Sequence, residues 1–163
     1  MAAPRHLGPE PDDFAAAVDD ALRPVLLLAA RASAKATQRV STSQLQALLV
    51  LQERGPMNLT SLAQELGAIP SSATRLCDRL VAADLITRET GAADRREVFL
   101  QLTTSGRRIV RQVRELRREG LREALEHSTS RERRELLSGL RALALRLSAT
   151  EADARGTATG YLP

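Results

Sequence analysis

The stretch AIPSSATRLCDRL, residues 68–80, places hydroxyl and guanidinium side chains together on one short helical pattern. At about 100° per residue, its polar and apolar side chains separate onto opposite faces. Hydroxyls and arginines donate hydrogen bonds to phosphates and base edges, and an arginine can bind guanine through two hydrogen bonds. The pattern alone fits a solvated surface helix equally well, so the surrounding elements must decide. The polar residues are Ser71, Ser72, Thr74, Arg75 and Arg79.

Catalytic chemistry is not indicated anywhere in the sequence. Cys77 is the single cysteine and lies on the apolar face of the same helical pattern, where a thiol behaves as a small inert hydrophobe. One cysteine and two distant histidines, His6 and His127, provide no credible metal-binding group. There is also no nucleophile–base arrangement and no phosphate-binding glycine loop. We therefore expect no cofactor, no metal and no enzymatic activity.

The composition is that of one helical domain with a basic surface. The 163 residues carry a formal charge of +4, which permits a polyanionic partner, although a GC-rich genome explains the arginine bias more simply. Hydrophobic residues make up 43% and aromatic residues 2%, so the core must consist of Leu, Ala and Val. The longest apolar run, residues 25–30, is too short for a membrane span, and no signal-peptide pattern is present. We expect a cytoplasmic protein without a membrane partner.

Helical periodicity governs the first part of the chain. A helix should start at residue 12, and Pro24 should kink or divide it. A second helix should be capped by Ser43 with Gln46 in a capping box and should end at Gly55. After a short extended piece, MNL, a two-turn helix is expected from a cap at Thr60 to a stop at Gly67, followed by a helix over residues 70–83.

Alternating residues then predict a β-hairpin. LITRET and EVFLQLT each alternate apolar and polar side chains, and the turn between them contains Gly91. Thr103 or Thr104 should cap a long helix that ends near Glu126, and a last helix follows. That last helix carries a coiled-coil-like seam formed by Leu136, Leu140, Leu143 and Leu147.

This order of elements predicts a mainly α protein with a small β-hairpin wing, that is, a winged helix-turn-helix flanked by long dimerisation helices. A helix pair followed by a hairpin is typical of a DNA-binding lobe, and the long helices are suited to dimerisation. The expected divisions are a mobile N-terminal arm (1–11), an N-terminal dimerisation helix (12–40), the DNA-binding lobe (41–102), C-terminal dimerisation helices (103–149) and a flexible tail (150–163).

Residues 59–106 closely resemble the multiple-antibiotic-resistance regulator (MarR) family, and the resemblance extends over roughly residues 12–148. The wing signature of that family, Asp-x-Arg followed by an alternating strand ending in Leu-Thr, matches DRREVFLQLT at residues 94–103. The resemblance implies a dimeric transcription regulator with its second helix in the major groove and its wing near the minor groove. Two positions depart from the family pattern: Ile69 replaces a capping residue, and Asp84 replaces a glycine.

The wing supplies further candidate DNA contacts. Arg95 and Arg96 can enter a narrow minor groove, and Asp94 can orient a guanidinium. The resemblance also suggests that Asp78 pairs with Arg96 and braces the wing, and these two roles compete for the same arginine. The following helix carries a stripe that is interpreted as a solvated face, formed by Arg107, Arg111, Arg114, Arg118 and Arg122. Only Arg107 and Arg108, near the wing, are candidates for phosphate contacts.

Many members of the family respond to small aromatic acids, and this resemblance suggests an effector pocket between the dimerisation layer and the DNA-binding lobe. The scarcity of aromatic residues leaves a regulator without an effector as an alternative. We predict a homodimeric repressor that binds double-stranded DNA at a pseudo-palindromic operator. The rival hypothesis is a winged-helix protein-interaction module without specific DNA binding. The candidate effector residues are Arg31, Gln38, Gln44 and Gln46.

Overall fold

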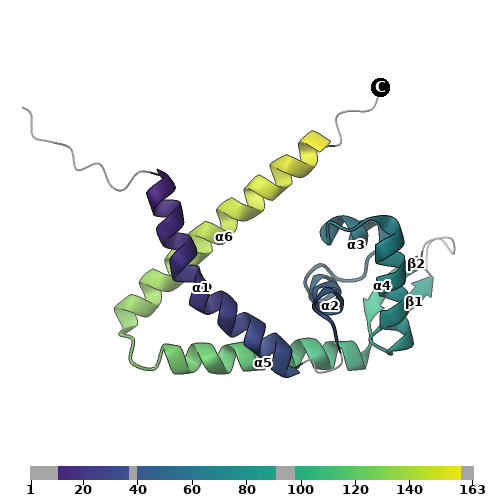
Figure 1. Ribbon diagram of the computed structural model, residues 1–163, viewed down its shortest axis with the longest axis horizontal. Coiled ribbons are helices and arrows are strands. Elements are labelled where there is room, and N and C mark those ends of the chain that lie inside the picture. The colour runs from purple at the N-terminus through teal and green to yellow at the C-terminus, as the bar shows by residue number, and fades with distance from the viewer. Residues whose placement is uncertain (1–10, 37–39, 91–97, 159–163) are drawn as a thin grey trace, which may run out of the picture. The chain divides into compact units, whose positions relative to one another are not determined.

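The computed structural model describes residues 11–36, 40–90 and 98–158 of the chain (Figure 1). The chain divides into two compact units, one up to Gly120 and one from Leu121 onward. The described residues confirm the mainly helical architecture with a single hairpin. The elements are α1 (Pro11–Ala36), α2 (Thr42–Arg54), α3 (Leu59–Glu65), α4 (Pro70–Ala82), β1 (Ile86–Thr90), β2 (Val98–Leu102), α5 (Thr104–Ala124) and α6 (Ser130–Ala158).

The winged-helix lobe is built from α2, α3, α4 and the hairpin. β1 and β2 pair in antiparallel fashion, with Ile86 opposite Leu102 and Thr90 opposite Val98. The expected short extended piece before α3 joins this sheet, because Met57 and the β2 residue Leu100 exchange backbone hydrogen bonds of 3.2 and 2.8 Å. The start of α3 is therefore tied directly to the wing.

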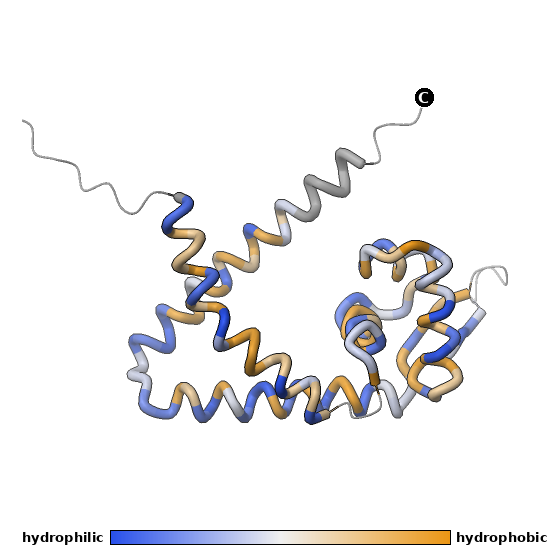
Figure 2. Tube along the Cα trace, viewed as in Figure 1, coloured by the Kyte–Doolittle hydropathy of each residue, from blue (hydrophilic) through white to orange (hydrophobic). Residues whose placement is uncertain are grey.

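The core of this lobe is aliphatic, as the composition predicts. Figure 2 shows hydrophobic residues recurring along α2, α4 and the hairpin strands. Among the described residues the buried hydrophobic set consists of Leu, Ala, Val, Ile and Cys side chains. The largest fully buried members are Leu48, Leu62, Leu80, Ile86, Leu100, Val110 and Val113.

Two predicted helix caps are wrong by two residues. α2 is capped by Ser41, whose Oγ accepts a hydrogen bond from the Gln44 N–H at 3.3 Å, while Gln44 Oε1 accepts from the Ser41 N–H at 2.9 Å. The Ser-x-x-Gln pattern occurs twice in succession, and the earlier copy gives the longer helix. α3 begins after Asn58, whose Oδ1 accepts from the Ser61 N–H at 2.8 Å, instead of after Thr60.

The predicted helix stops are confirmed. Gly55 after α2 and Gly67 after α3 have φ angles of 82° and 59°, values that a glycine adopts without strain. Asp84 occupies the turn after α4 with a φ of 54°, so the left-handed turn is retained without the glycine that the family favours. Its carbonyl accepts a hydrogen bond from Thr103 Oγ1 at 2.7 Å, and its Oδ2 accepts from Ser105 Oγ at 3.1 Å.

The long helices differ from the prediction in two respects. α1 continues through Pro24 as one helix of 26 residues, so of the two predicted outcomes, a kink or a division, the division does not occur. α6 continues to Ala158, so the flexible tail predicted from residue 150 starts too early. Residues 151–158 include three alanines, and alanine has the highest helix propensity.

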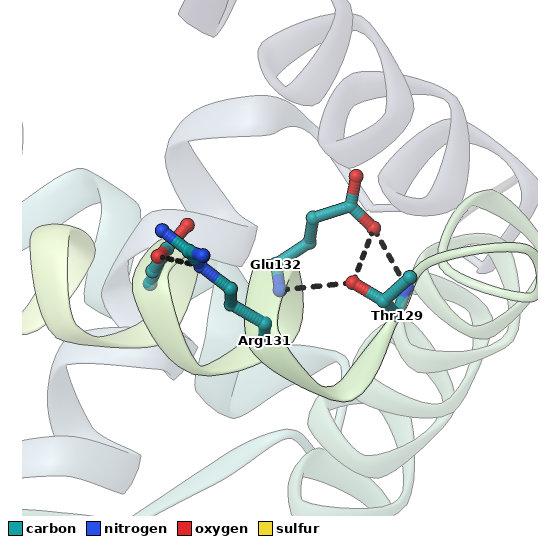
Figure 3. Close-up of polar contacts among 4 residues, drawn as sticks. Thr129, Arg131 and Glu132 are labelled. Carbon is teal, nitrogen blue, oxygen red and sulfur yellow. Dashed lines mark hydrogen bonds and ion pairs between the residues drawn. The ribbon is translucent and has the colours of Figure 1, made fainter.

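α6 begins with a reciprocal cap (Figure 3). The Thr129 N–H and Oγ1 donate to Glu132 Oε2 at 2.7 and 2.8 Å, and the Glu132 N–H donates to Thr129 Oγ1 at 3.3 Å. The backbone and side-chain hydrogen bonds from Thr129 lower the pKa of the Glu132 carboxyl. Within the described ranges, no helix combines the length and the apolar character that a membrane crossing requires.

Candidate nucleic-acid interface

The second helix of the helix-turn-helix, α4, has one buried and one exposed face. Ala73, Cys77 and Leu80 are completely buried, whereas Arg75 and Arg79 on the other side are exposed. The predicted phase of this helix is therefore confirmed. Thr74 lies at the flank, and its Oγ1 donates to the Pro70 carbonyl at 2.9 Å, so only the acceptor capacity of its hydroxyl remains for a ligand. Ser71, Ser72 and Asp78 complete the exposed face.

The start of α4 carries no side-chain cap. Ile69 occupies the N-cap position with an extended backbone, Pro70 is the first helical residue, and the N-cap side chain accepts no hydrogen bond from the first N–H groups of the helix. Thr103 supplies the corresponding cap for α5, because its Oγ1 accepts from the Gly106 N–H at 3.0 Å. The sequence leaves open whether Thr103 or Thr104 caps α5, and the structure shows that Thr103 does.

An ion pair joins α4 to the wing. Arg88 of β1 donates to Asp78 Oδ1 at 2.6 Å. Both side chains are about half exposed, at 42% and 55%, so the pair contributes at most about 1 kcal/mol to folding stability. The main effect of the ion pair is to hold α4 in position relative to the wing, because it links the middle of α4 to the first strand of the hairpin.

Sequence analysis predicts the wing-bracing role of Asp78 and misses Arg88. Arg88 lies two residues after the buried Ile86, and strand alternation places both side chains on the same face of β1. That alternation was the signal available in the sequence. The three wing residues Asp94, Arg95 and Arg96 lie outside the described residues, so the pairing of Arg96 with Asp78 stays a prediction.

The base of the wing is fixed to α5. Arg107 Nη1 donates to the carbonyl of Leu102, the last residue of β2, at 2.6 Å. The Thr103 N–H donates to the Leu85 carbonyl at 3.1 Å, which closes the junction between β1, β2 and α5. Arg108, the neighbouring candidate for a phosphate contact, is exposed. Thus Arg107 already has a structural partner, and Arg108 is the freer of the two cations.

Cys77 is buried under the exposed face of α4, as predicted. Desolvation raises the pKa of its thiol; nearby Arg88 acts in the opposite direction, and Asp78 raises the pKa further. A buried thiol with a raised pKa carries little of the reactive thiolate. The geometry therefore supports a packing role for this cysteine.

A cavity of about 640 Å³ lies between residues of α1, α2 and α5. Of the candidate effector residues, Gln46 lines this cavity, whereas Arg31 is exposed on α1 and does not line it. Gln44 Oε1 is engaged by the capping box of α2. The role of these residues in binding an effector stays a prediction. Gln38 lies outside the described residues.

Arg117 is the lining residue that sequence analysis missed. Its Nη2 donates to Ser33 Oγ at 3.4 Å, while its Nε is buried and has no hydrogen-bond partner among the described groups. Arg117 follows the buried Val113 by four residues, which places it on the core-facing side of α5. That spacing was the available sequence signal.

The comparisons with known proteins agree with this geometry. A model of the MarR family matches residues 40–98. The chain is 34% identical over 108 residues to ML2140, an uncharacterized HTH-type transcriptional regulator of Mycobacterium leprae, and the match covers 66% of this chain and 75% of that protein. The chain belongs to the MarR family. This is a family of transcriptional regulators, not of enzymes.

Two further matches define the extent of the similarity. YfiV, an uncharacterized HTH-type regulator of Bacillus subtilis, is 31% identical over 101 residues; the match covers 62% of this MarR-family chain and 63% of YfiV, slightly less than two thirds of its length. The crystal structure of Rv1404 from Mycobacterium tuberculosis is 35% identical, with a TM-score of 0.76, and the match covers 86% of this chain and 97% of Rv1404.

Proposed function

We propose that this MarR-family chain is a homodimeric transcriptional repressor that acts in the cytoplasm and binds a pseudo-palindromic operator in double-stranded DNA. The observation that carries the proposal is the exposed face of α4. Its serines and arginines lie opposite a completely buried apolar face, and the Asp78–Arg88 ion pair links the helix to the wing. A helix held in this way can enter the major groove while the wing approaches the neighbouring backbone.

The contacts on α4 divide according to position. Ser71, Ser72 and Thr74 make the N-terminal half slim enough to enter the groove, and Arg75 lies next to them. Arg75 therefore reads a base edge or an adjacent phosphate, whereas Arg79, one turn later, meets the phosphate backbone. Arg95 and Arg96 of the wing supply the minor-groove contacts, with Asp94 orienting a guanidinium, and Arg108 adds a contact to a backbone phosphate.

The dimer is supported by apolar side chains that remain exposed in a single chain. On α6, Leu136 and Leu140 are 48% and 46% exposed, and Leu147 is exposed as well. On α1 the exposed apolar residues include Phe14 and Leu26. Burial of both sets across a two-fold axis removes this surface from water. Two copies of α4 related by that axis read half-sites about one helical turn apart.

The repressive action is supported by one relative. The Bacillus subtilis regulator MdtR, a transcriptional repressor, is 35% identical to this chain over 69 residues. A dimer bound over a promoter blocks access by polymerase without any further contact. Transcription in vitro from a promoter that overlaps the operator should therefore fall as the protein is added, and a rise would identify an activator.

The cavity lined by Gln46 and Arg117 is the proposed site of a small-molecule effector that releases the DNA. Its volume lies within the roughly 300–1,000 Å³ usual for ligand pockets. The unpartnered Nε of Arg117 favours a ligand with an acidic group. The cavity lies beside α2, whose buried residues Leu48 and Leu51 belong to the same core as α4, so occupancy can shift the DNA-binding helix.

The decisive experiment is fluorescence anisotropy with DNA from the intergenic region beside the gene, repeated at several salt concentrations. We expect affinity to fall steeply with salt, and Arg79→Ala to weaken binding to all sequences alike and reduce the salt slope by about one phosphate equivalent. Arg141→Ala on α6 is the matched control, since it removes an equal charge from an exposed site. Absence of salt-dependent DNA binding would favour the protein-interaction module.

The assembly requires its own measurement. Sedimentation equilibrium should give a dimer of the 17.7 kDa chain at low micromolar concentration, and Leu140→Glu should shift it toward monomer because a carboxylate replaces an apolar contact. A parent protein that sediments as a monomer under these conditions contradicts the homodimer, whatever the result with DNA.

A further inference from the structure

A second hollow, of about 320 Å³, lies along the arginine stripe of α5. Sequence analysis interprets this stripe as a solvated face, but the structure shows a concave site that α2 also lines through Gln52. Four arginines and one glutamate give its lining a formal charge of +3. The lining residues are Gln52, Arg107, Val110, Arg111, Arg114, Glu115 and Arg118.

Of the four arginines that line the hollow, only the first and the last have side-chain partners among the described residues. Arg107 donates to the Leu102 carbonyl at 2.6 Å, and Arg118 donates to Glu115 Oε1 at 3.0 Å. Arg111 and Arg114, in the middle, make no ion pair or side-chain hydrogen bond with any residue that the structure describes. The single carboxylate of the lining is thus already engaged at one end.

The unpaired arginines are also the least favourably placed. Like charges three or four residues apart on a helix destabilise it by about 0.2–0.5 kcal/mol for each pair. Arg114 is only partly exposed and follows the buried Val110 by four residues, so part of its side chain is removed from water. An anion between Arg111 and Arg114 would offset their mutual repulsion.

We propose that this hollow binds a compact multivalent oxyanion of the condensed-phosphate type. The helical rise places successive arginines of the stripe about 4.5–6 Å apart along the axis. Each guanidinium can donate hydrogen bonds to two oxygens of one oxyanion. Linked phosphates can therefore bind neighbouring arginines at the same time, whereas a monocarboxylate can bind only one arginine. The Gln52 amide can donate a further hydrogen bond from α2.

The concave shape favours such a small anion over a DNA duplex, whose convex surface would contact projecting side chains first. No residue of α4 lines this hollow. The proposed site is therefore separate from the DNA-binding face and stands or falls independently of the proposed repressor function. Condensed phosphate could arrive free or as part of a nucleotide, and the binding experiment distinguishes these sources.

The test is isothermal titration calorimetry of the full chain at constant ionic strength, with sodium tripolyphosphate, ATP and sodium acetate as the three probes. We expect tripolyphosphate to bind with one site per chain and acetate to give no measurable heat. The double variant Arg111→Gln/Arg114→Gln should weaken tripolyphosphate binding at least about ten-fold, equivalent to about 1.4 kcal/mol. ATP binding tighter than tripolyphosphate would identify a nucleotide, and weaker ATP binding a free polyphosphate; both support the proposal.

The control is Arg134→Gln/Arg141→Gln, which removes the same charge from exposed positions of α6. It should change the tripolyphosphate affinity less than about two-fold, because screened charges distant from a bound anion contribute little. Equal weakening in the two double variants, or no binding to the parent, overturns the proposal. The proposal is also overturned if Arg111→Gln/Arg114→Gln loses affinity for duplex DNA while its tripolyphosphate affinity is unchanged, since the two arginines would then bind DNA.

Discussion

Replacing Gly106 with alanine should disrupt the junction between the wing and α5. Gly106 lies in the first turn of α5, and a Cβ added there would lie 2.1 Å from the Leu85 carbonyl oxygen and 3.1 Å from its carbon. The same Cβ would be 3.2 Å from Leu102 Cδ2. The nearest group is backbone, and it accepts the hydrogen bond from the Thr103 N–H at 3.1 Å, so it cannot move aside without breaking that bond.

The magnitudes decide the sign of the effect. A substitution of glycine by alanine inside a helix normally stabilises the folded protein by up to about 1 kcal/mol. Against this, a buried carbonyl that loses its partner costs about 1–3 kcal/mol, and overpacking costs about 1–3 kcal/mol. The net expectation is a loss of about 3 kcal/mol in the free energy of unfolding. For a chain of this length, that corresponds to a fall in Tm of roughly 6–12 °C.

Urea denaturation followed by far-UV circular dichroism, at one fixed protein concentration, measures this loss. Gly139→Ala is the matched control, because its new Cβ would meet no described atom within 4 Å beyond its chain neighbours and its own helix backbone, and it should be neutral to slightly stabilising. Gly120→Ala should be intermediate, since its Cβ meets only the Leu28 side chain, which can rotate away. A Gly106→Ala protein as stable as its parent would refute the reasoning.

Three further predictions concern α4 and α6. In a double-mutant cycle of Asp78→Ala and Arg88→Ala, the coupling energy measured from the free energy of unfolding should be at most about 1 kcal/mol. The coupling energy measured from operator affinity should be larger, because the ion pair positions α4 against the wing. Equal coupling energies in the two measurements would argue against this role. Cys77→Ser should cost about 1–3 kcal/mol of stability through a buried hydroxyl, with Cys77→Ala as the control that adds no polar group. Thr129 lowers the folded-state pKa of the Glu132 carboxyl. The ionised carboxylate therefore stabilises the folded protein at pH values above its unfolded-state pKa, and this stabilisation is lost as the pH falls through the lower folded-state pKa. Glu132→Gln should therefore lose less stability than the parent on acidification below about pH 4.5, and parallel pH curves would contradict this.

The sequence predicts the order of the elements well, because that order depends on local patterns. Leucine periodicity defines the helices, alternation defines the hairpin, and the turns at Gly55, Gly67 and Asp84 follow from residues that tolerate positive φ. The caps of α2 and α3 are displaced because competing cap residues lie two positions apart. Choosing Ser41 over Ser43 requires knowing where the helix begins to pack, and no local pattern contains that information.

The site is less predictable wherever a side chain acquires its role from another element. The sequence singles out Asp78 with Arg96 as its partner, whereas the described partner is Arg88, which becomes a candidate only once β1 is known to lie against α4. Likewise Gln44 is plausible as a pocket residue until the capping box occupies its side chain. In both cases composition identifies a suitable chemical group, and tertiary contact decides what that group binds.

α5 illustrates the same dependence on helical phase. Val110 and Val113 face the core, Arg117 projects from that side into the proposed effector cavity, and Arg111 and Arg114 line the separate hollow. Arg117 and Arg114 differ by only three residues, yet they line different sites because one follows Val113 and the other Val110 by four positions. The two sites should therefore be separable by mutation. Arg117→Gln should remove binding of an acidic effector and leave tripolyphosphate binding unchanged, and Arg111→Gln/Arg114→Gln should do the reverse.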